Sequence, residues 1–274
     1  MRGVLVAAAM VAAAAQGAHA ADMPEFGALR GAVVDTPPGV VNWQGFYVGG
    51  QAAYGTSDMD FSNATSDITA RMLVNTSIEN EGGVSSWPVL GKTSSHGQGW
   101  GGFAGYNAQW DDVVLGIEAN YLHGNFGGAQ TGSMSRFFST TNGYTNSVLY
   151  QANAAINVKD MGSARLRAGW AFGSFLPYAF GGVALGQADI IRSATVSGTQ
   201  VNASAAPGFT NVPFYSTGSQ VQNNHFIYGY SAGLGMDMML YRGLFLRAEW
   251  EYQKFAAPIN TAVSTVRGGI GYKF

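Results

Sequence analysis

The chain has 274 residues, no cysteine and a formal net charge of −2, and only 11% of its residues are charged. Without cysteine it has no disulfide framework, thiolate nucleophile or Cys-ligated metal site. Its slightly acidic balance is not that of a nucleic-acid-binding protein. Glycine, at 39 residues, is about twice as frequent as in an average protein. Aromatic residues reach 13%.

The first twenty residues have the pattern of an export signal. Arg2 precedes an apolar run over residues 3–15, and residues 18–20 (Ala-His-Ala) fit the rule for signal cleavage. The mature chain is therefore predicted to begin at Ala21. The run is shorter than the roughly 20 apolar residues of a spanning helix, although an uncleaved membrane anchor is the alternative. Export, few charges and many aromatics favour a membrane β-barrel over a secreted β-sandwich.

A leader separates the signal from the first predicted strand. Residues 21–42 contain three prolines and no clear period, which predicts a flexible periplasmic leader. The outer-membrane barrel is predicted to span residues 43–274 and to begin with a strand over 43–54. The outward phase of this strand holds Phe46, Val48, Ala52 and Tyr54, and Gln51 faces inward.

The next strands keep this alternation of apolar and polar residues. Residues 100–110 and 113–121 are predicted to pair across a tight turn at Asp111-Asp112. The fourth strand centres on residues 164–170, with Leu166 and Trp170 facing outward. The same outward phase runs back through Val158, Ile156, Ala154, Ala152 and Tyr150. This strand is therefore predicted to project well beyond the bilayer.

Four more strands complete the predicted barrel. Turns at Gly173-Ser174 and Arg242-Gly243 connect the fourth strand to 177–186, and 228–238 to 244–252. In the fifth strand the favoured phase places Ala179, Val183 and Leu185 outward. The C-terminal strand has Ile270, Tyr272 and Phe274 on one face, and Arg267, Gly269, Gly271 and Lys273 on the other. A last strand that is apolar outside, small or charged inside, and ends on an aromatic residue suits the closing strand of a barrel in lipid.

The predicted connections alternate in length. Those after the second, fourth and sixth strands are a few residues long, whereas those after the first, third and fifth are tens of residues long. Short periplasmic turns and long extracellular loops are typical of an all-β, eight-stranded antiparallel transmembrane β-barrel. The long loops are rich in Ser, Thr, Asn and Gly, and are interpreted as disordered caps, extended β-arms or binding surface.

Nine charged residues fall in the inward phase of these strands. They are Glu118, Arg165, Arg167, Asp237, Arg247, Glu249, Glu251, Arg267 and Lys273. The interior of an eight-stranded barrel is just wide enough for side chains to fill, so these residues are predicted to form a lumen charge network of paired Arg and carboxylate groups. The preferred interpretation is a polar plug that closes the lumen, and the alternative is an ion path.

Several segments resemble one family. Trp43-x-Gly45-Phe46-Tyr47-Val48-Gly49-Gly50, together with residues 114–119, 162–169 and 176–184, is similar to the small alphaproteobacterial outer-membrane β-barrels, the porin-family outer-membrane immunogenic proteins, which are opacity-like in pattern. The resemblance covers most of 43–274 apart from the long loops. It implies an outer-membrane location and an envelope role, without catalysis. Gly269, Tyr272 and Phe274 match the assembly signal of such barrels.

The sequence therefore predicts a Gram-negative outer-membrane protein with a structural and surface-exposed role in the cell envelope. Its expected partners are outer-membrane lipid, lipopolysaccharide and the outer-membrane insertion machinery, with no nucleic acid, cofactor or metal. A narrow passive, porin-like channel for small solutes is the alternative. An enzyme at the outer rim is a weaker hypothesis, because His96, His123 and His225 fall near that rim but share no catalytic motif with a nucleophile.

Overall fold

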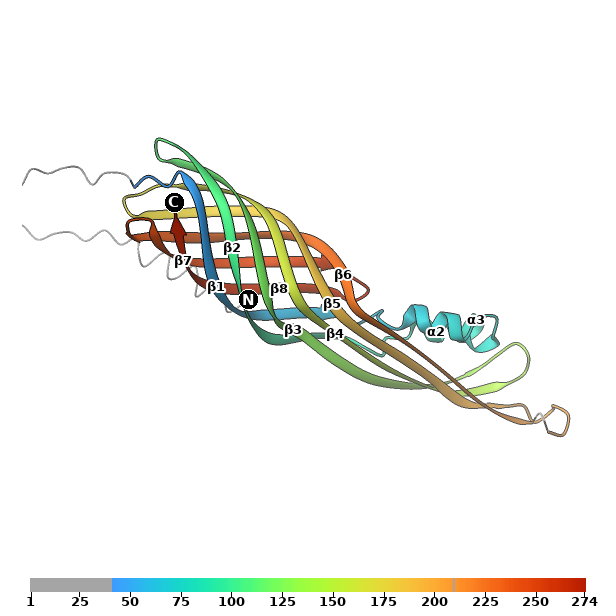
Figure 1. Ribbon diagram of the computed structural model, residues 1–274. Coiled ribbons are helices and arrows are strands. Elements are labelled where there is room, and N and C mark those ends of the chain that lie inside the picture. Colours follow the sequence, from blue (N-terminus) through green and yellow to red (C-terminus); the bar gives the residue numbers. More distant parts are fainter. Residues whose placement is uncertain (1–40, 209) are drawn as a thin grey trace, which may run out of the picture. The chain divides into compact units, whose positions relative to one another are not determined.

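Eight strands form one closed antiparallel barrel in chain order, which confirms the predicted fold class (Figure 1). The computed structural model describes residues 41–208 and 210–274, so the predicted signal and nearly all of the predicted leader lie outside the described residues. The ring closes because β1 pairs with both β2 and β8. The strands are β1 (Gly45–Asp60), β2 (Lys92–Trp110), β3 (Val113–Ser139), β4 (Thr145–Trp170), β5 (Phe175–Val201), β6 (Asn211–Tyr241), β7 (Leu244–Ala256) and β8 (Asn260–Lys273).

Within the barrel the side chains follow the predicted alternation. In β1, Phe46 and Tyr54 are 67% and 59% exposed, whereas Gln51 is only 6% exposed. The favoured phase of β5 is confirmed by the exposed Val183 and Leu185. Trp43 was predicted to belong to the first strand, but it precedes β1. Its side chain is buried among the apolar residues at one end of the interior.

Three tight turns join β2 to β3, β4 to β5 and β6 to β7. The last of these has Arg242 and Gly243 between the strands, with φ of 43° and 93°. Positive φ at both central residues is the geometry of the type I′ hairpin turn, whose twist matches that of the flanking strands. A Cβ at position 243 would lie only 2.4 Å from the backbone carbonyl oxygen of Lys273. Glycine is therefore required here on both conformational and steric grounds.

Strands β3 to β6 continue as a four-stranded sheet beyond the ring (Figure 1). We call this sheet the arm, and define it as residues 126–139, 145–158, 188–201 and 211–225. β2 pairs with β3 only as far as Asn125, and β7 pairs with β6 only from Tyr228, so the arm has two free edges among the described residues. Of the three interpretations of the long loops, the extended β-arm applies to those after β3 and β5.

Register shifts cross the sheet where the ring passes into the arm. They lie between His123 and Phe126, between Val158 and Asp160, and between Ala188 and Ile190. An extra residue in one strand reverses which face its later side chains occupy. Lys159 lies at the shift in β4 and forms an ion pair with Asp189; the hydrogen bond from its ammonium group lowers the pKa of the Asp189 carboxyl.

The shift in β4 corrects one prediction. Tyr150, Ala152, Ala154, Ile156 and Val158 were expected to share the outward phase of Leu166, yet all five are buried. Because the bulge reverses the phase above Asp160, they face the inner side of the arm. The projecting strand was predicted correctly, but the face that it buries was not.

The loop between β1 and β2 covers the inner side of the arm. It contains the helices α2 (Ser66–Met72) and α3 (Ser77–Gly82) and the short helix η1 (Val84–Ser86). Thr76 caps α3 by accepting a hydrogen bond from the backbone N–H of Glu79, which is the first half of a Thr-x-x-Glu capping box. None of these helices is long and apolar enough to cross a membrane, within the described part of the chain.

The helices and the arm share one apolar core. Ile68, Leu73, Ile78 and Val84 from this loop pack with the buried residues of β4 and β5. Polar contacts add to the packing: the hydroxyl of Thr69 donates to the Tyr150 hydroxyl at 2.8 Å. Arg192 of β5 donates to the carbonyl oxygen of Ala64 (2.8 Å) and pairs with Asp67 (2.9 Å). This guanidinium therefore ties the start of α2 to the arm.

We predict that Arg192→Ala loosens the loop of residues 61–91 without opening the barrel. The substitution removes the donor to Ala64 and Asp67, and leaves a buried carbonyl oxygen without its partner. Limited proteolysis of the folded protein should cut this loop several times faster. Arg71→Ala is the matched control, since Arg71 contacts Asp67 only through an exposed i,i+4 pair. Equal cutting of both variants would contradict the role of Arg192.

Candidate functional site

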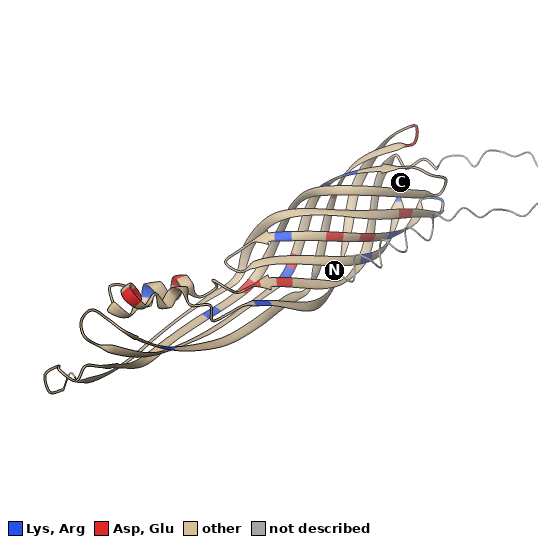
Figure 2. Ribbon diagram, turned by 180° about the vertical axis from the view of Figure 1, so that it is seen from behind, with Lys and Arg blue, Asp and Glu red and all other residues tan. Residues whose placement is uncertain are grey.

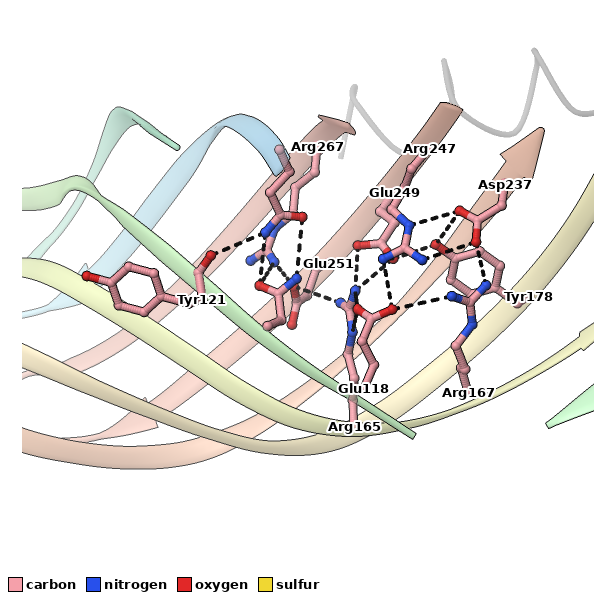
Figure 3. Close-up of polar contacts among 12 residues, drawn as sticks. Glu118, Tyr121, Arg165, Arg167, Tyr178, Asp237, Arg247, Glu249, Glu251 and Arg267 are labelled. Carbon is pink, nitrogen blue, oxygen red and sulfur yellow. Dashed lines mark hydrogen bonds and ion pairs between the residues drawn. The ribbon is translucent and has the colours of Figure 1, made fainter. Parts of the chain in front are cut away.

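The barrel interior holds a cluster of buried charged residues from five strands. Eight of the nine inward charges predicted from the sequence lie in it. They are Glu118 of β3, Arg165 and Arg167 of β4, Asp237 of β6, Arg247, Glu249 and Glu251 of β7, and Arg267 of β8. Their side chains are at most 2% exposed. We call these eight residues the charged layer (Figure 3).

Arg165 lies at the centre of the layer. It is the direct cross-strand neighbour of Glu118, and its Nε donates to Glu118 Oε1 at 2.9 Å. Its Nη2 reaches both carboxylate oxygens of Glu249 at 2.8 Å, and its Nη1 lies 3.3 Å from Glu251 Oε2. One guanidinium therefore joins carboxylates from two strands that are not neighbours in the barrel wall.

A second set of contacts surrounds Asp237. Arg247, its cross-strand neighbour, donates from Nε to Oδ1 at 2.9 Å and from Nη2 to Oδ2 at 3.1 Å. This is the bidentate arrangement that gives Arg–carboxylate pairs their strength and direction. Arg167 Nη2 adds a bond to Oδ2 at 2.7 Å, and Arg247 Nη1 reaches Glu118 Oε2 at 2.8 Å. Glu118 thus connects this set to Arg165.

Arg267 completes the layer on the closing strand. Its Nη1 lies 2.5 Å from Glu251 Oε2 and donates to Asn120 Oδ1 at 2.8 Å, while Nε donates to the Thr265 hydroxyl at 3.1 Å. The layer contains four guanidinium and four carboxylate groups, so its formal charge is zero. Such balance matters because an isolated charge in a low-dielectric interior costs several kcal/mol.

Lys273 lies elsewhere. It was predicted with the other inward charges, but its ammonium group donates to the carbonyl oxygens of Gln44 (3.0 Å) and Phe274 (3.4 Å) at an exposed position. The physical reason is its place at the end of β8, where the side chain reaches solvent and backbone oxygens rather than the interior. Removing it from the predicted set also removes the surplus positive charge.

Aromatic side chains of the interior were not predicted as part of this site. The hydroxyl of Tyr47 donates to Glu118 Oε2 (2.7 Å), and that of Tyr178 donates to Glu249 Oε1 (2.5 Å). The ring centroid of Phe103 lies 3.8 Å from the guanidinium carbon of Arg247, and that of Phe180 lies 4.0 Å from the guanidinium carbon of Arg165. The alternation in the sequence could have identified these aromatic residues, because all four occupy the inward phase of their strands.

Apolar side chains close the interior on both sides of the charged layer. At the end with the tight turns, a cluster contains Trp43, Tyr47, Phe103, Val114, Ala171, Leu176, Tyr178, Phe180 and Phe245. On the side of the arm, Leu122, Met161, Ile227, Phe255 and Val263 belong to the core that continues into the arm. The described interior is therefore a stack of apolar, charged and apolar side chains.

The predicted assembly-signal residues lie together along β8. Gly269 faces the interior, where a Cβ would approach the carbonyl oxygen of Gly50 to 2.8 Å. Tyr272 and Phe274 face outward with ring centroids 5.2 Å apart, and the backbone N–H of Phe274 donates to Phe46 at 2.9 Å. The last residue of the chain is thus hydrogen-bonded to the first strand of the ring.

Two of the three histidines near the outer rim contact different residues. His123 lies 2.8 Å from Asp160, which also accepts a hydrogen bond from the Tyr121 hydroxyl at 2.6 Å. His96 instead stacks on Tyr54, at 5.9 Å between ring centroids. In the described residues there is no group of three or more His, Asp or Glu side chains that could hold a metal ion.

Comparisons with solved structures find small outer-membrane β-barrels. Ail, the attachment invasion locus protein of Yersinia pestis, is 12% identical with a TM-score of 0.38, covering 84% of this chain and 99% of that chain. Neisserial surface protein A is 13% identical with a TM-score of 0.36, covering 84% and 97%. The N-terminal β-barrel domain of Pseudomonas aeruginosa OprF is 13% identical with a TM-score of 0.23, covering 82% and 99%. No protein-family model and no curated protein matches the chain.

We predict that Arg165→Ala destabilises the folded barrel by on the order of 3–5 kcal/mol, because it leaves buried carboxylates uncompensated. Urea unfolding in detergent micelles measures the change. Lys273→Ala removes a charge of the same sign from an exposed position and should change the midpoint little. Equal midpoints for Arg165→Ala and wild type would show that the charged layer does not support the fold.

Proposed function

We propose that this chain is an integral outer-membrane protein, with a barrel that serves as a closed structural anchor and an arm that is presented at the cell surface. The observation that carries the proposal is the combination of an apolar exterior with a filled, neutral interior. Large apolar side chains, including Leu166, Leu234, Trp250 and Val266, are exposed on the outside of the ring. In water such a surface would be costly, whereas in lipid it is the stable arrangement.

The extent of the apolar band supports a membrane-spanning barrel. In β3 the outward residues run without a charge from Val113 to Tyr121, a segment of about nine residues, which is the length of a tilted transmembrane strand. Trp110 and Trp170 lie at one end of this band, and Tyr121 and Tyr228 lie at the other. Rings of this type prefer the interface between lipid and water.

The proposal includes location and partners. Export by the N-terminal signal, insertion by the outer-membrane assembly machinery and contact with lipid and lipopolysaccharide follow from an outer-membrane barrel. The similarity of residues 43–50 and 176–184 to the porin-family outer-membrane immunogenic proteins of alphaproteobacteria supports the same envelope role. A structural role is favoured over a channel because the charged layer and its two apolar neighbours fill the interior.

The proposal of a closed barrel in the membrane predicts three observations on the same protein. It should stay in the membrane fraction after salt washing, and unboiled samples should migrate differently from boiled ones, because a closed barrel keeps every backbone group paired in detergent. In planar bilayers it should give no discrete conductance steps. Release by salt with identical mobilities would contradict the barrel in lipid. Regular conductance steps from heat-modifiable protein would instead support the channel alternative.

The C-terminal residue generates a separate prediction. Phe274→Asp should lower the fraction of protein assembled in the outer membrane severalfold, because it places a charge at the lipid interface and alters the expected recognition signal. Heat-dependent mobility of outer-membrane preparations measures this fraction.

Two control variants separate the possible causes. Phe137→Asp changes an aromatic residue of the arm that is 78% exposed and should leave assembly intact. Trp110→Asp places a charge in the same aromatic belt without altering the C-terminus. Equal harm from Trp110→Asp and Phe274→Asp would show that Phe274 acts only as a belt residue.

A further inference from the structure

The two faces of the arm differ in chemistry. The inner face is apolar and is covered by the loop of residues 61–91, as described above. The opposite face, which we call the outer face, carries alcohol and amide side chains from all four strands. These are Thr131, Ser133 and Ser135 of β3, Gln151 and Asn153 of β4, Ser193, Thr195 and Ser197 of β5, and Thr217 and Ser219 of β6.

The strand register aligns these side chains in rows across the sheet. One row contains Thr131, Asn153, Ser193 and Ser219, and the next contains Ser133, Gln151, Thr195 and Thr217. Neighbours in a row are about 5 Å apart, and successive rows are about 7 Å apart along the strands. Thr195 and Thr217 share a hydrogen bond of 3.1 Å, and Thr131 donates to Asn153. These two rows form a regular grid of hydrogen-bonding groups. On the side of the ring the grid is bounded by the exposed apolar side chains of Ile191 and Val221.

No charged side chain interrupts this grid among the described residues. Arg136 and Arg192, in the same strands, face the inner side, where Arg136 lies over Trp87 and Arg192 holds α2. On the outer side the charged Asp189 lies two rows beyond Ser193, towards the ring, and is paired with Lys159. Figure 2 shows that the strands of the arm are almost entirely uncharged. Because the grid itself carries no charge, it offers no specific electrostatic attraction to anionic or cationic ligands.

Exposed aromatic rings flank the grid. Tyr215 of β6 is 71% exposed and belongs to the row of Ser135, Leu149 and Ser197. Phe137 of β3 is 78% exposed in the next row. Flat rings beside alcohol and amide groups provide the two contacts that a pyranose needs: an apolar surface for its C–H face and polar partners for its hydroxyl groups.

We propose that the outer face of the arm binds a neutral, hydroxyl-rich polysaccharide. Charge complementarity carries the choice of ligand: an uncharged grid of donors and acceptors matches a polymer whose groups are both donors and acceptors and carry no charge. The shallow sheet binds each sugar weakly, and many repeats together give useful affinity. The inference rests on the proposed function, because the arm reaches an external polysaccharide only if the barrel is anchored in the outer membrane.

The test uses the full mature chain, folded in a zwitterionic detergent that contains no sugar. Cellobiose, cellohexaose and maltohexaose are titrated, with heparin as the anionic comparison. We expect binding of at least one hexasaccharide, a clearly weaker affinity for the disaccharide, and no binding of heparin. Gln151→Ala/Asn153→Ala should weaken hexasaccharide binding by at least about tenfold, because both substitutions remove central amides. Tyr215→Ser should weaken it to a similar extent.

The matched control is Gln98→Ala/Asn125→Ala. It removes two exposed amides from paired residues of β2 and β3 that lie outside the arm, so affinity should not change. Heat-dependent mobility establishes that every variant is folded. Folded protein that binds none of the hexasaccharides would overturn the inference while leaving the proposed membrane function intact. Equal weakening of binding by the two double variants would also overturn it. So would a dimer in solution that Gln151→Ala/Asn153→Ala converts to a monomer, because the outer face would then be covered by a second copy of the chain.

Discussion

The structure depends on the closure of the sheet, in which β1 pairs with both β2 and β8. Closure leaves no free edge within the ring, so every backbone group there has a partner on the next strand, as lipid requires. It also fixes the side on which each residue lies, because neighbouring residues of a strand face opposite ways. The inward charges therefore share one narrow space, and their only stable arrangement is mutual pairing.

That pairing explains the composition of the charged layer. Glu118 and Arg165, and likewise Asp237 and Arg247, are opposite each other in adjacent strands, so the ladder itself brings opposite charges together. Arg165 then crosses the interior to Glu249, which makes the network a connection between distant parts of the wall. Such a network is of limited value for stability compared with apolar packing, but removal of any single member is costly. A slip of one residue between strands would turn the shifted strand's charged side chains to the opposite face and separate these pairs, so the network favours the observed register.

Periodicity predicted the barrel, its eight strands and all eight residues of the charged layer, because one rule of alternation governs each strand of the ring. It failed where the rule is interrupted. The buried face of residues 150–158 was assigned to the wrong side, since a bulge at Lys159–Asp160 leaves no mark in hydrophobicity. Tyr47 and Tyr178 lie on the inward phase of their strands, but they were not predicted as site residues because only charged side chains were considered. Helix α3 could have been found from its cap, Thr76, with Glu79 three residues later.

The bulges have a further consequence for how one sheet serves two solvents. In the ring, apolar residues such as Leu166 point outward and polar residues point inward, whereas in the arm Ile156 points inward and Asn153 points outward. A single extra residue in β4 is sufficient to make this reversal without breaking the strand. The same continuous strand is therefore suited to lipid below the bulge and to water above it. The loop of residues 61–91 supplies the apolar partner that the reversed face then requires.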